Sequence, residues 1–283
     1  MESITRVGIV GSGIMGAGLA EVIARAGYQV VVRSRSMEAV NEMKATIDRD
    51  FQKAIQRGRL TEEERVIVLG RISETDDLNQ LADCDLVIES VVEDLHVKLH
   101  LFEELDRIVK PSAILATNTS TLAVVAMARA TQRPDLVCGI HFFNPAPVMT
   151  LVEVVRPITA SDETIATAVE FATRCGKEVV ETKDHSGFVV NALLFPYLNN
   201  AVYMLERGTA PMEGIDIAMK GGCNFPMGPF ALLDLVGIDT TVAILDALHA
   251  QFGDAHYDAA PTLRKMVADG ELGRKTKRGF YSY

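Results

Sequence analysis

Cysteine is scarce in this 283-residue sequence, and its spacing argues against two kinds of site. The four cysteines lie far apart and form neither a CxxC pair nor a Cys/His pair: Cys84, Cys138, Cys175 and Cys223. A zinc site or a disulfide framework needs grouped ligands or paired thiols, so we interpret these residues as reduced packing residues of a cytoplasmic protein. We therefore expect no metal site.

Long hydrophobic runs are also missing. No apolar stretch reaches the length of a transmembrane segment. The N-terminus has no charged leader followed by an apolar run, which is the pattern of a secretory signal. We therefore expect no membrane partner and no secretion.

Positive charge is in deficit. The chain has 28 Lys and Arg against 38 Asp and Glu, a formal net charge of −10. This balance disfavours nucleic acid or an anionic membrane as a partner, and an anionic ligand needs a local basic site. With 48% hydrophobic residues, the chain can still bury a substantial core.

The segment 6–27, RVGIVGSGIMGAGLAEVIARAG, joins a strand-like run to a helical pattern through three glycines. Gly11 and Gly13 permit a tight turn without Cβ atoms, and Gly16 permits close packing of the helix on the strand. Ile14 and Met15 begin that helix, whose free N–H groups would meet a pyrophosphate. We predict dinucleotide binding here; the alternative is a glycine turn in another α/β fold.

Strand and helix patterns alternate over the first two thirds of the chain. Apolar runs predict strands at 6–10, 29–33, 73–77, 86–89, 113–117, 137–141, 151–155 and 178–181. Helices are predicted after the glycine turn and at 37–58, 61–69 and 97–109, with Thr61 and Glu64 as a capping box. This alternation predicts an α/β, Rossmann-type, doubly wound and mostly parallel sheet, with a change of direction at its edge.

The pattern becomes helical after about residue 186. Helices are predicted at 188–207, 212–220, 230–252 and 261–269. We therefore predict a dinucleotide-binding domain over 1–185 and a smaller all-helical C-terminal domain over 186–283, with the boundary near 184–187.

The end of the second predicted strand bears on cofactor choice. NAD-binding folds commonly carry Asp or Glu about 20 residues after the glycines, to bind the ribose hydroxyls. Here Arg33, Ser34 and Arg35 occupy that place, and the first carboxylate is Glu38. Arginines can grip the 2′-phosphate of NADP. We predict NADP(H) over NAD(H); in the alternative reading the arginines are solvated and Ser34 binds NAD weakly.

Three further segments carry a family resemblance: Asn118-Thr119-Ser120, the run HFFNPAP from His141, and SGFVVN from Ser186 to Asn191. With GSGIMG, PMGPFALLDLVG at 226–237 and the closing GRKTKRGFYSY, they resemble the short-chain L-3-hydroxyacyl-CoA dehydrogenases along essentially the whole chain, especially the bacterial 3-hydroxybutyryl-CoA dehydrogenases. The resemblance implies a short-chain acyl-CoA substrate and a homodimer formed through the helical half.

The chemistry of such an enzyme requires a base whose pKa lies near the working pH, and histidine is suited to this role. His141 ends a predicted strand, where open α/β sheets bind ligands. Glu153, twelve residues later, can fix the tautomer of the ring. The family pattern implies that Ser120 and Asn191 hydrogen-bond the substrate oxygens. A lone histidine is more often structural, but the family positions of its companions lead us to predict a catalytic role.

Further cofactor contacts are implied by the resemblance. Glu93 and Lys98 match family positions near the nicotinamide and its ribose, and Asn118 and Lys275 match other cofactor contacts. The alternatives are a helix-start acid for Glu93, an exposed lysine for Lys98 and a surface lysine for Lys275.

On the 37–58 helix, Lys53 matches a family lysine near the phosphates of CoA, and Arg57 lies one turn beyond it on the same face. A solvated helix face explains both residues nearly as well. Farther along the chain, Phe195, Asn199 and Asn200 could shape the acyl pocket or simply pack. The sequence is compatible with either role for these three residues.

The leading hypothesis is an NADP(H)-dependent enzyme that interconverts acetoacetyl-CoA and (S)-3-hydroxybutyryl-CoA. One alternative is a relative that acts on a carrier-protein thioester or another 3-hydroxy acid. A second alternative, from a different class, is a non-catalytic dinucleotide-binding relative in which the fold has outlived the activity.

Overall fold

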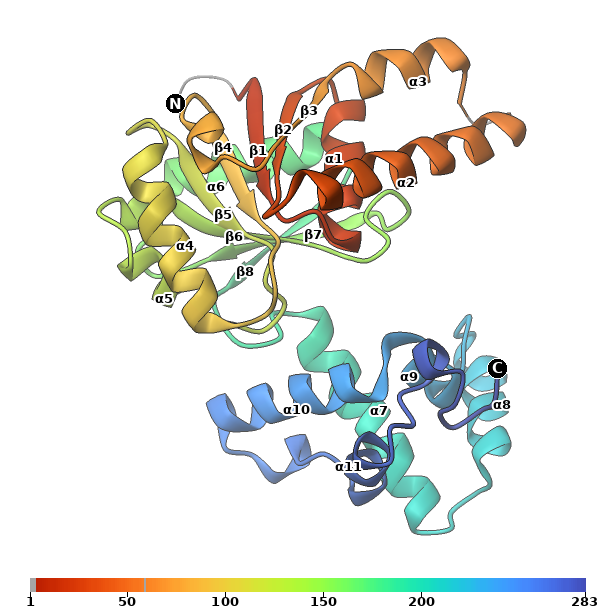
Figure 1. Ribbon diagram of the computed structural model, residues 1–283. Coiled ribbons are helices and arrows are strands. Elements are labelled where there is room, and N and C mark those ends of the chain that lie inside the picture. The colour runs from red at the N-terminus through yellow and green to blue at the C-terminus, as the bar shows by residue number, and fades with distance from the viewer. Residues whose placement is uncertain (1–3, 59) are drawn as a thin grey trace. The chain divides into compact units, whose positions relative to one another are not determined.

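The computed structural model describes residues 4–58 and 60–283. Its contacts divide the chain into two compact units, with the boundary along the sequence between Asp184 and His185. The first unit contains a sheet with helices, and the second is helical (Figure 1). Within the described ranges, no helix is both long enough and apolar enough to cross a membrane.

One eight-stranded sheet organises the first unit. Its strands are β1 (Arg6–Val10), β2 (Gln29–Arg33), β3 (Ile72–Thr75), β4 (Leu86–Glu89), β5 (Ile114–Thr117), β6 (Val137–Phe142), β7 (Leu151–Arg156) and β8 (Glu178–Lys183). They lie in the order β3-β2-β1-β4-β5-β6-β7-β8. All neighbours are parallel except β6 and β7. The predicted Rossmann-type, mostly parallel sheet is confirmed, and its first six strands have the dinucleotide-binding order.

The helices of the first unit connect these strands. They are α1 (Ile14–Arg25), α2 (Met37–Gln56), α3 (Glu62–Leu69), α4 (Leu95–Ile108), α5 (Val124–Arg129) and α6 (Asp162–Arg174). Because the strand order runs outward from β1 in both directions, right-handed crossovers put helices on both faces of the sheet. The three valines of β2 are accordingly all buried, as expected for a strand covered on both sides.

Local capping explains where α3 and α6 begin. Thr61 accepts a hydrogen bond from the N–H of Glu64, whose carboxylate accepts one from the N–H of Thr61, so the predicted capping box is confirmed. Ser161 caps α6 in a similar way, through the N–H of Thr164. Neither α5 nor α6 is among the helices predicted from the sequence.

The second unit has its own core. Its helices are α7 (Val190–Glu206), α8 (Met212–Cys223), α9 (Pro229–Val236), α10 (Ile238–Phe252) and α11 (Pro261–Ala268). Phe195, Leu198, Phe230 and Leu245 are among the buried side chains that form this core.

The prediction of a single helix over 230–252 is wrong. Gly237 has a φ of 106°, a conformation that side chains with a Cβ rarely adopt, and it separates α9 from α10. The apolar periodicity continues across the glycine, so the pattern alone does not reveal the break.

A carboxylate at the start of β4 fastens this strand to β1. The Asp85 side chain accepts hydrogen bonds from the N–H groups of Thr5 (2.7 Å) and Arg6 (2.8 Å), and Lys110 donates to its other oxygen. Burial alone would raise the pKa of Asp85, but the hydrogen bonds from Lys110 and from the backbone lower this pKa to about 2. The folded state therefore favours the ionised carboxyl group.

We expect Asp85→Asn to lower the free energy of unfolding by about 2 kcal/mol at pH 7, from the difference between the folded and unfolded pKa. Since the folded pKa is depressed, this contribution is present above about pH 4 and is lost as the pH falls toward about 2. Urea unfolding between these pH values should show the gap between wild type and variant closing. Asp83→Asn, at an exposed position, is the control. Equal stability of wild type and Asp85→Asn at pH 7 would contradict this account.

Candidate active site

Two of the three glycines in the turn after β1 leave no room for a Cβ atom. A Cβ atom on Gly11, whose φ is 122°, would lie 2.3 Å from the carbonyl oxygen of Ser90, and one on Gly16 would lie 1.9 Å from that of Gly11. A Cβ on Gly13 would meet nothing within 4 Å. Gly11 and Gly16 therefore make the close turn possible, whereas Gly13 leaves open space at its tip.

The N-terminus of α1 faces this turn. Gly13 is its N-cap, and the first helical hydrogen bond runs from the N–H of Ala17 to the carbonyl of Gly13 (2.9 Å). The N–H groups of Ile14, Met15 and Gly16 thus precede Ala17, the first donor of the helix, and have no acceptor within the helix. No acidic residue lies in the first turn. Free N–H groups, the positive end of the helix dipole and open space at Gly13 fit a pyrophosphate.

The end of β2 lies directly beside the glycine turn. The carbonyl of Arg33 accepts the N–H of Gly11 (2.9 Å), and the Ser34 hydroxyl lies 2.8 Å from that of Ser12. Ser34 is buried and Arg35 is exposed. Within the described part of the chain, the buried Nε of Arg33 has no hydrogen-bond partner. The arginines predicted to select the cofactor are therefore next to the turn.

The pairing of β6 with β7 brings His141 and Glu153 together. The two residues are directly opposite in the antiparallel register, so their side chains point to the same face. Nδ1 of His141 lies 2.8 Å from Oε2 of Glu153, and both side chains are buried. Because the carboxylate can only accept, Nδ1 carries the proton in this pair.

The other ring nitrogen of His141 faces the loop after β5. Its Nε2 lies 3.0 Å from the hydroxyl of Ser120. With the proton on Nδ1, Nε2 of the neutral ring is an acceptor. Asn118, earlier in the same loop, accepts the N–H of Phe142 through Oδ1 (2.8 Å) and so joins the loop to β6. The imidazole is therefore held between a carboxylate and a hydroxyl, with Nε2 able to take up a proton.

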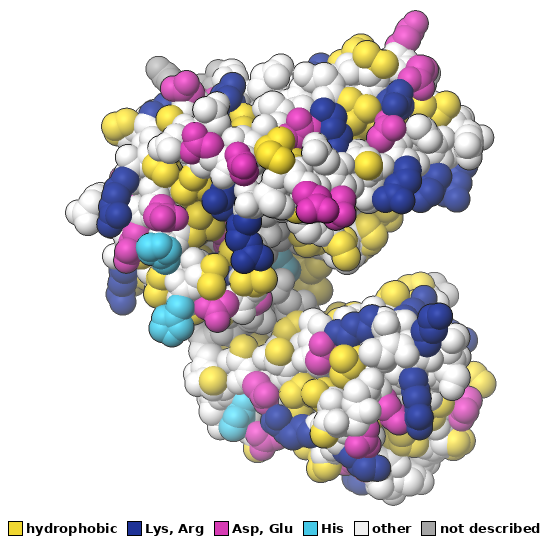
Figure 2. All heavy atoms as spheres, viewed as in Figure 1, with side chains coloured by type: hydrophobic (Ala, Val, Ile, Leu, Met, Phe, Trp, Pro, Cys, Tyr) yellow, Lys and Arg dark blue, Asp and Glu magenta, His cyan; other side chains and the backbone are white. Residues whose placement is uncertain are grey.

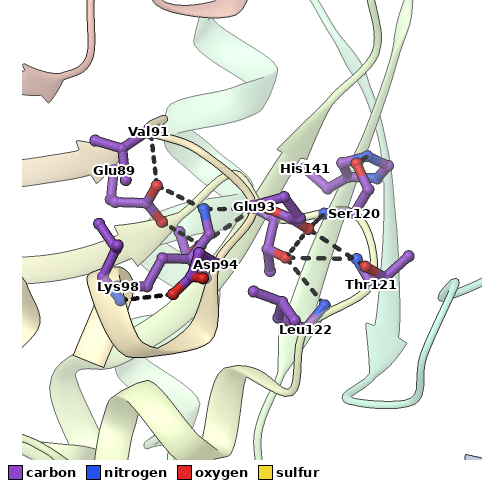
Figure 3. A network of polar contacts seen from close by, with 12 residues as sticks. Glu89, Val91, Glu93, Asp94, Lys98, Ser120, Thr121, Leu122 and His141 are labelled. Atoms are coloured by element: carbon purple, nitrogen blue, oxygen red, sulfur yellow. Dashed lines mark hydrogen bonds and ion pairs between the residues drawn. The ribbon is translucent and has the colours of Figure 1, made fainter. Parts of the chain in front are cut away.

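Lys98 is buried, so the alternative reading of an exposed lysine is wrong. Only 1% of its side chain is exposed, and its Nζ lies 2.6 Å from Glu89 and 3.2 Å from Glu93. Asp94, and not Glu93, caps α4. Instead, Glu93 accepts the N–H of Ser120 (3.0 Å) and the hydroxyl of Thr119. Figure 3 shows Glu93 between the Glu89–Lys98 pair and the loop of Ser120.

The pKa of Glu93 reflects these contacts. Burial raises this pKa, but the attraction of Lys98 and the hydrogen bonds from Thr119 and Ser120 outweigh burial and lower it. Glu93 is therefore ionised at neutral pH. Glu89 is fully buried and was not among the predicted site residues. Its place directly after the apolar residues of the run DLVIE is the sequence signal that could have indicated a buried acid.

The second unit carries two predicted site residues. Asn191 is buried in the first turn of α7. Lys275 is exposed, and its Nζ donates to both carboxylate oxygens of Asp239. Asn199 accepts the N–H of Ala260 (2.9 Å) and donates to the carbonyl of Asp258 (2.7 Å), which identifies it as a packing residue.

Two other side chains of α7 differ in exposure: Phe195 is buried in the core of the second unit, and Asn200 is exposed. In the first unit, Lys53 and Arg57 are exposed at the end of α2, and basic side chains are visible where this helix lies (Figure 2). Lys53 pairs with Asp50 at 2.8 Å.

Over residues 4–58 and 60–283, no group of three or more His, Cys, Asp or Glu side chains is placed to hold a metal ion.

Comparison with known proteins gives matches over both units. Residues 6–185 match the family described as 3-hydroxyacyl-CoA dehydrogenase, NAD binding domain, and residues 187–283 match 3-hydroxyacyl-CoA dehydrogenase, C-terminal domain. A 3-hydroxybutyryl-CoA dehydrogenase of Mycobacterium tuberculosis is 48% identical over 284 residues, which cover 100% of this chain and 99% of that protein.

Two further relatives show the same likeness. The mitochondrial hydroxyacyl-coenzyme A dehydrogenase of Sus scrofa is 41% identical over 287 residues, which cover 99% of this chain and 91% of that protein. The crystal structure of (S)-3-hydroxybutyryl-CoA dehydrogenase from Ralstonia eutropha superposes with a TM-score of 0.97 at 41% identity and covers 99% of each chain.

The different surroundings of Gly16 and Gly13 predict different mutational effects. Gly16→Ala should destabilise the fold by about 1–3 kcal/mol, because its Cβ would overlap backbone that cannot move aside. Gly13 has a φ of −69°, which alanine tolerates, so Gly13→Ala should fold normally and bind NAD(P)H about tenfold more weakly through lost phosphate contacts. Thermal unfolding and nucleotide fluorescence test both variants. A Gly16→Ala protein as stable as wild type would refute the steric argument.

Proposed function

This chain belongs to the 3-hydroxyacyl-CoA dehydrogenase family, and we propose that it interconverts acetoacetyl-CoA and (S)-3-hydroxybutyryl-CoA. The observation that carries the proposal is the Ser120–His141–Glu153 arrangement, in which His141 and Glu153 are buried, beside the dinucleotide-binding edge of the sheet. The names of the relatives in Mycobacterium tuberculosis and Ralstonia eutropha support the four-carbon thioester and the S configuration.

In the direction of oxidation, Nε2 of His141 takes the proton of the substrate hydroxyl. A nicotinamide, when bound, would supply the acceptor for the hydride that leaves the same carbon. Glu153 stabilises the imidazolium that forms and holds the ring in place. Ser120 orients the substrate oxygen toward Nε2 of His141. In the reverse direction, His141 gives its proton to the oxygen of the ketone, so proton and hydride together make the alcohol.

The two units divide the remaining work in this proposal. Residues 1–185 bind the dinucleotide, with Glu93, Lys98 and Asn118 at the nicotinamide end, and the exposed cations Lys53 and Arg57 attract the CoA phosphates. Residues 186–283 supply Asn191 to the substrate, Lys275 to the cofactor and a face for a homodimer. Exposed apolar side chains of the second unit support such a face: Leu193, Ile217, Phe225 and Leu235.

NADP(H) is the cofactor that the end of β2 supports. A carboxylate there would repel a 2′-phosphate, whereas Ser34 is neutral and Arg33 and Arg35 flank it. A hydrogen bond between arginine and phosphate contributes about 1.5–3 kcal/mol, which is enough to reverse a preference for NAD(H). The family that matches residues 6–185 is described as an NAD binding domain, which does not distinguish NADP(H) from NAD(H).

We expect His141→Ala to lower kcat about 10²–10⁴-fold, because the proton loses its acceptor, and to leave cofactor binding nearly unchanged. Absorbance at 340 nm with acetoacetyl-CoA and NADPH measures turnover, and nucleotide fluorescence measures binding. The exposed His100 provides the control, since His100→Ala should keep wild-type kcat. Retention of most activity by His141→Ala would contradict the proposed role of His141 in proton transfer. Lack of any turnover by wild type would favour a non-catalytic dinucleotide-binding protein. Turnover of a carrier-protein thioester, but not of acetoacetyl-CoA, would favour an enzyme that acts on carrier-protein thioesters.

We expect wild type to have a higher kcat/KM with NADPH than with NADH, and Ser34→Asp to lower the NADPH value about 10–100-fold by placing a charge beside the 2′-phosphate. Ser34→Ala, which removes the contact with Ser12 without adding charge, should change the preference little. Steady-state kinetics of the three proteins with both cofactors tests this. Preference of wild type for NADH would show the cofactor proposal to be wrong.

A further inference from the structure

We propose that Glu89 is a positioning residue for this reaction, which holds the Ser120 loop against His141 through two separate arms. The inference rests on the proposed function for its kinetic consequence only. Glu89 is the last residue of β4 and is fully buried, and its carboxylate accepts hydrogen bonds from Val91, Lys98 and Thr117. Its effect on the proton transfer must therefore pass through other side chains.

The Glu89 carboxylate accepts three hydrogen bonds. Oε1 receives the N–H of Val91 (2.7 Å) and Nζ of Lys98 (2.6 Å), and Oε2 receives the hydroxyl of Thr117 (2.8 Å). These donors come from the loop after β4, from α4 and from the end of β5. A buried carboxylate is costly unless it is paired and hydrogen-bonded, and here all three surrounding elements supply a donor.

The first arm runs through charge. Glu89 holds Lys98, whose Nζ also lies 3.2 Å from Oε2 of Glu93. The other oxygen of Glu93 accepts the N–H of Ser120 at 3.0 Å and the hydroxyl of Thr119. Without the negative charge of Glu89, Lys98 would have Glu93 alone as its anionic partner among these contacts, and would draw that carboxylate away from the loop.

The second arm runs through hydroxyl groups. The Thr117 hydroxyl donates its single proton to Glu89 and accepts the N–H of Thr119 (3.1 Å). The Thr119 hydroxyl in turn accepts the N–H of Leu122 (3.0 Å). Both arms therefore end on the backbone of residues 119–122, which carries Ser120 to within 3.0 Å of the histidine ring. Figure 3 shows Glu89, Glu93 and Lys98 on one side and Ser120 and Leu122 of this loop on the other, beside His141.

The primary test is Glu89→Gln, which keeps the shape of the side chain and removes its charge. The amide cannot accept at both ends, so one arm must lose its acceptor. We expect kcat for acetoacetyl-CoA reduction to fall about tenfold, with KM for the thioester within about twofold of wild type. Asp85→Asn is the matched control: it is the same acid-to-amide change at the opposite end of β4, and it should lower stability while leaving kcat unchanged.

A double mutant separates positioning from general destabilisation. In a Ser120→Ala protein the hydroxyl that Glu89 positions is gone, so adding Glu89→Gln should lower kcat less than twofold further. An equal, tenfold loss in both backgrounds would overturn the proposal, and so would a kcat loss for Glu89→Gln no larger than that for Asp85→Asn.

Amide hydrogen exchange gives a readout that does not depend on turnover. Exchange of residues 118–122 should accelerate at least tenfold in Glu89→Gln relative to segments in β1 and β2, and should not do so in Asp85→Asn. If Glu89→Gln fails to fold, Thr117→Val cuts the second arm alone and should give the same acceleration with about a threefold lower kcat. Unchanged exchange overturns the positioning role. Absence of turnover in wild type instead overturns the proposed function, and the exchange result still decides the role of Glu89.

Discussion

The antiparallel pairing of β6 and β7 is the constraint on which the candidate site depends. In a wholly parallel sheet, a residue twelve positions after His141 would lie in the connection that follows β6. Reversal at the edge places Glu153 directly opposite His141, where facing side chains of neighbouring strands are close enough to interact. A one-residue slip of register would turn Glu153 to the other face of the sheet. The register thus fixes which nitrogen of the ring is protonated.

The parallel part of the sheet supplies the rest of the site, because its strands end at one edge. Val10 is aligned with Arg33 and with Glu89, and Glu89 with Thr117. The glycine turn, the arginines at the end of β2, the buried carboxylate of β4 and the Ser120 loop consequently lie side by side. This is the edge at which open α/β sheets bind ligands. Charges buried there are tolerable because each has a partner, as Lys98 has in Glu89 and Glu93.

Much of this could be predicted from sequence wherever the cause is local. The capping box of Thr61 and Glu64, the glycine turn and the apolar strands are decided by residues within a few positions of one another. Helix α5 is different: its first N–H groups, at Val124 and Val125, are accepted by Asp184, about sixty residues away. The burial of Lys98 likewise depends on Glu89 in another element. Periodicity does not reveal long-range polar partners, so it could predict neither α5 nor the burial of Lys98. Helix α6 is also absent from the prediction, although its cap by Ser161 is local.

Because the chain is acidic, its binding of anionic ligands must depend on groups close to the glycine turn. With a net charge of −10, the protein repels anions at a distance, so a dinucleotide or an acyl-CoA gains little from long-range steering. Its attraction must come from short-range groups that salt screens weakly once a ligand covers them. Backbone N–H groups at the start of α1 are such groups, since they carry no net charge and act only at contact. In the proposed function, the arginines at the end of β2 and the cations near the end of α2 add full charges beside the expected phosphates.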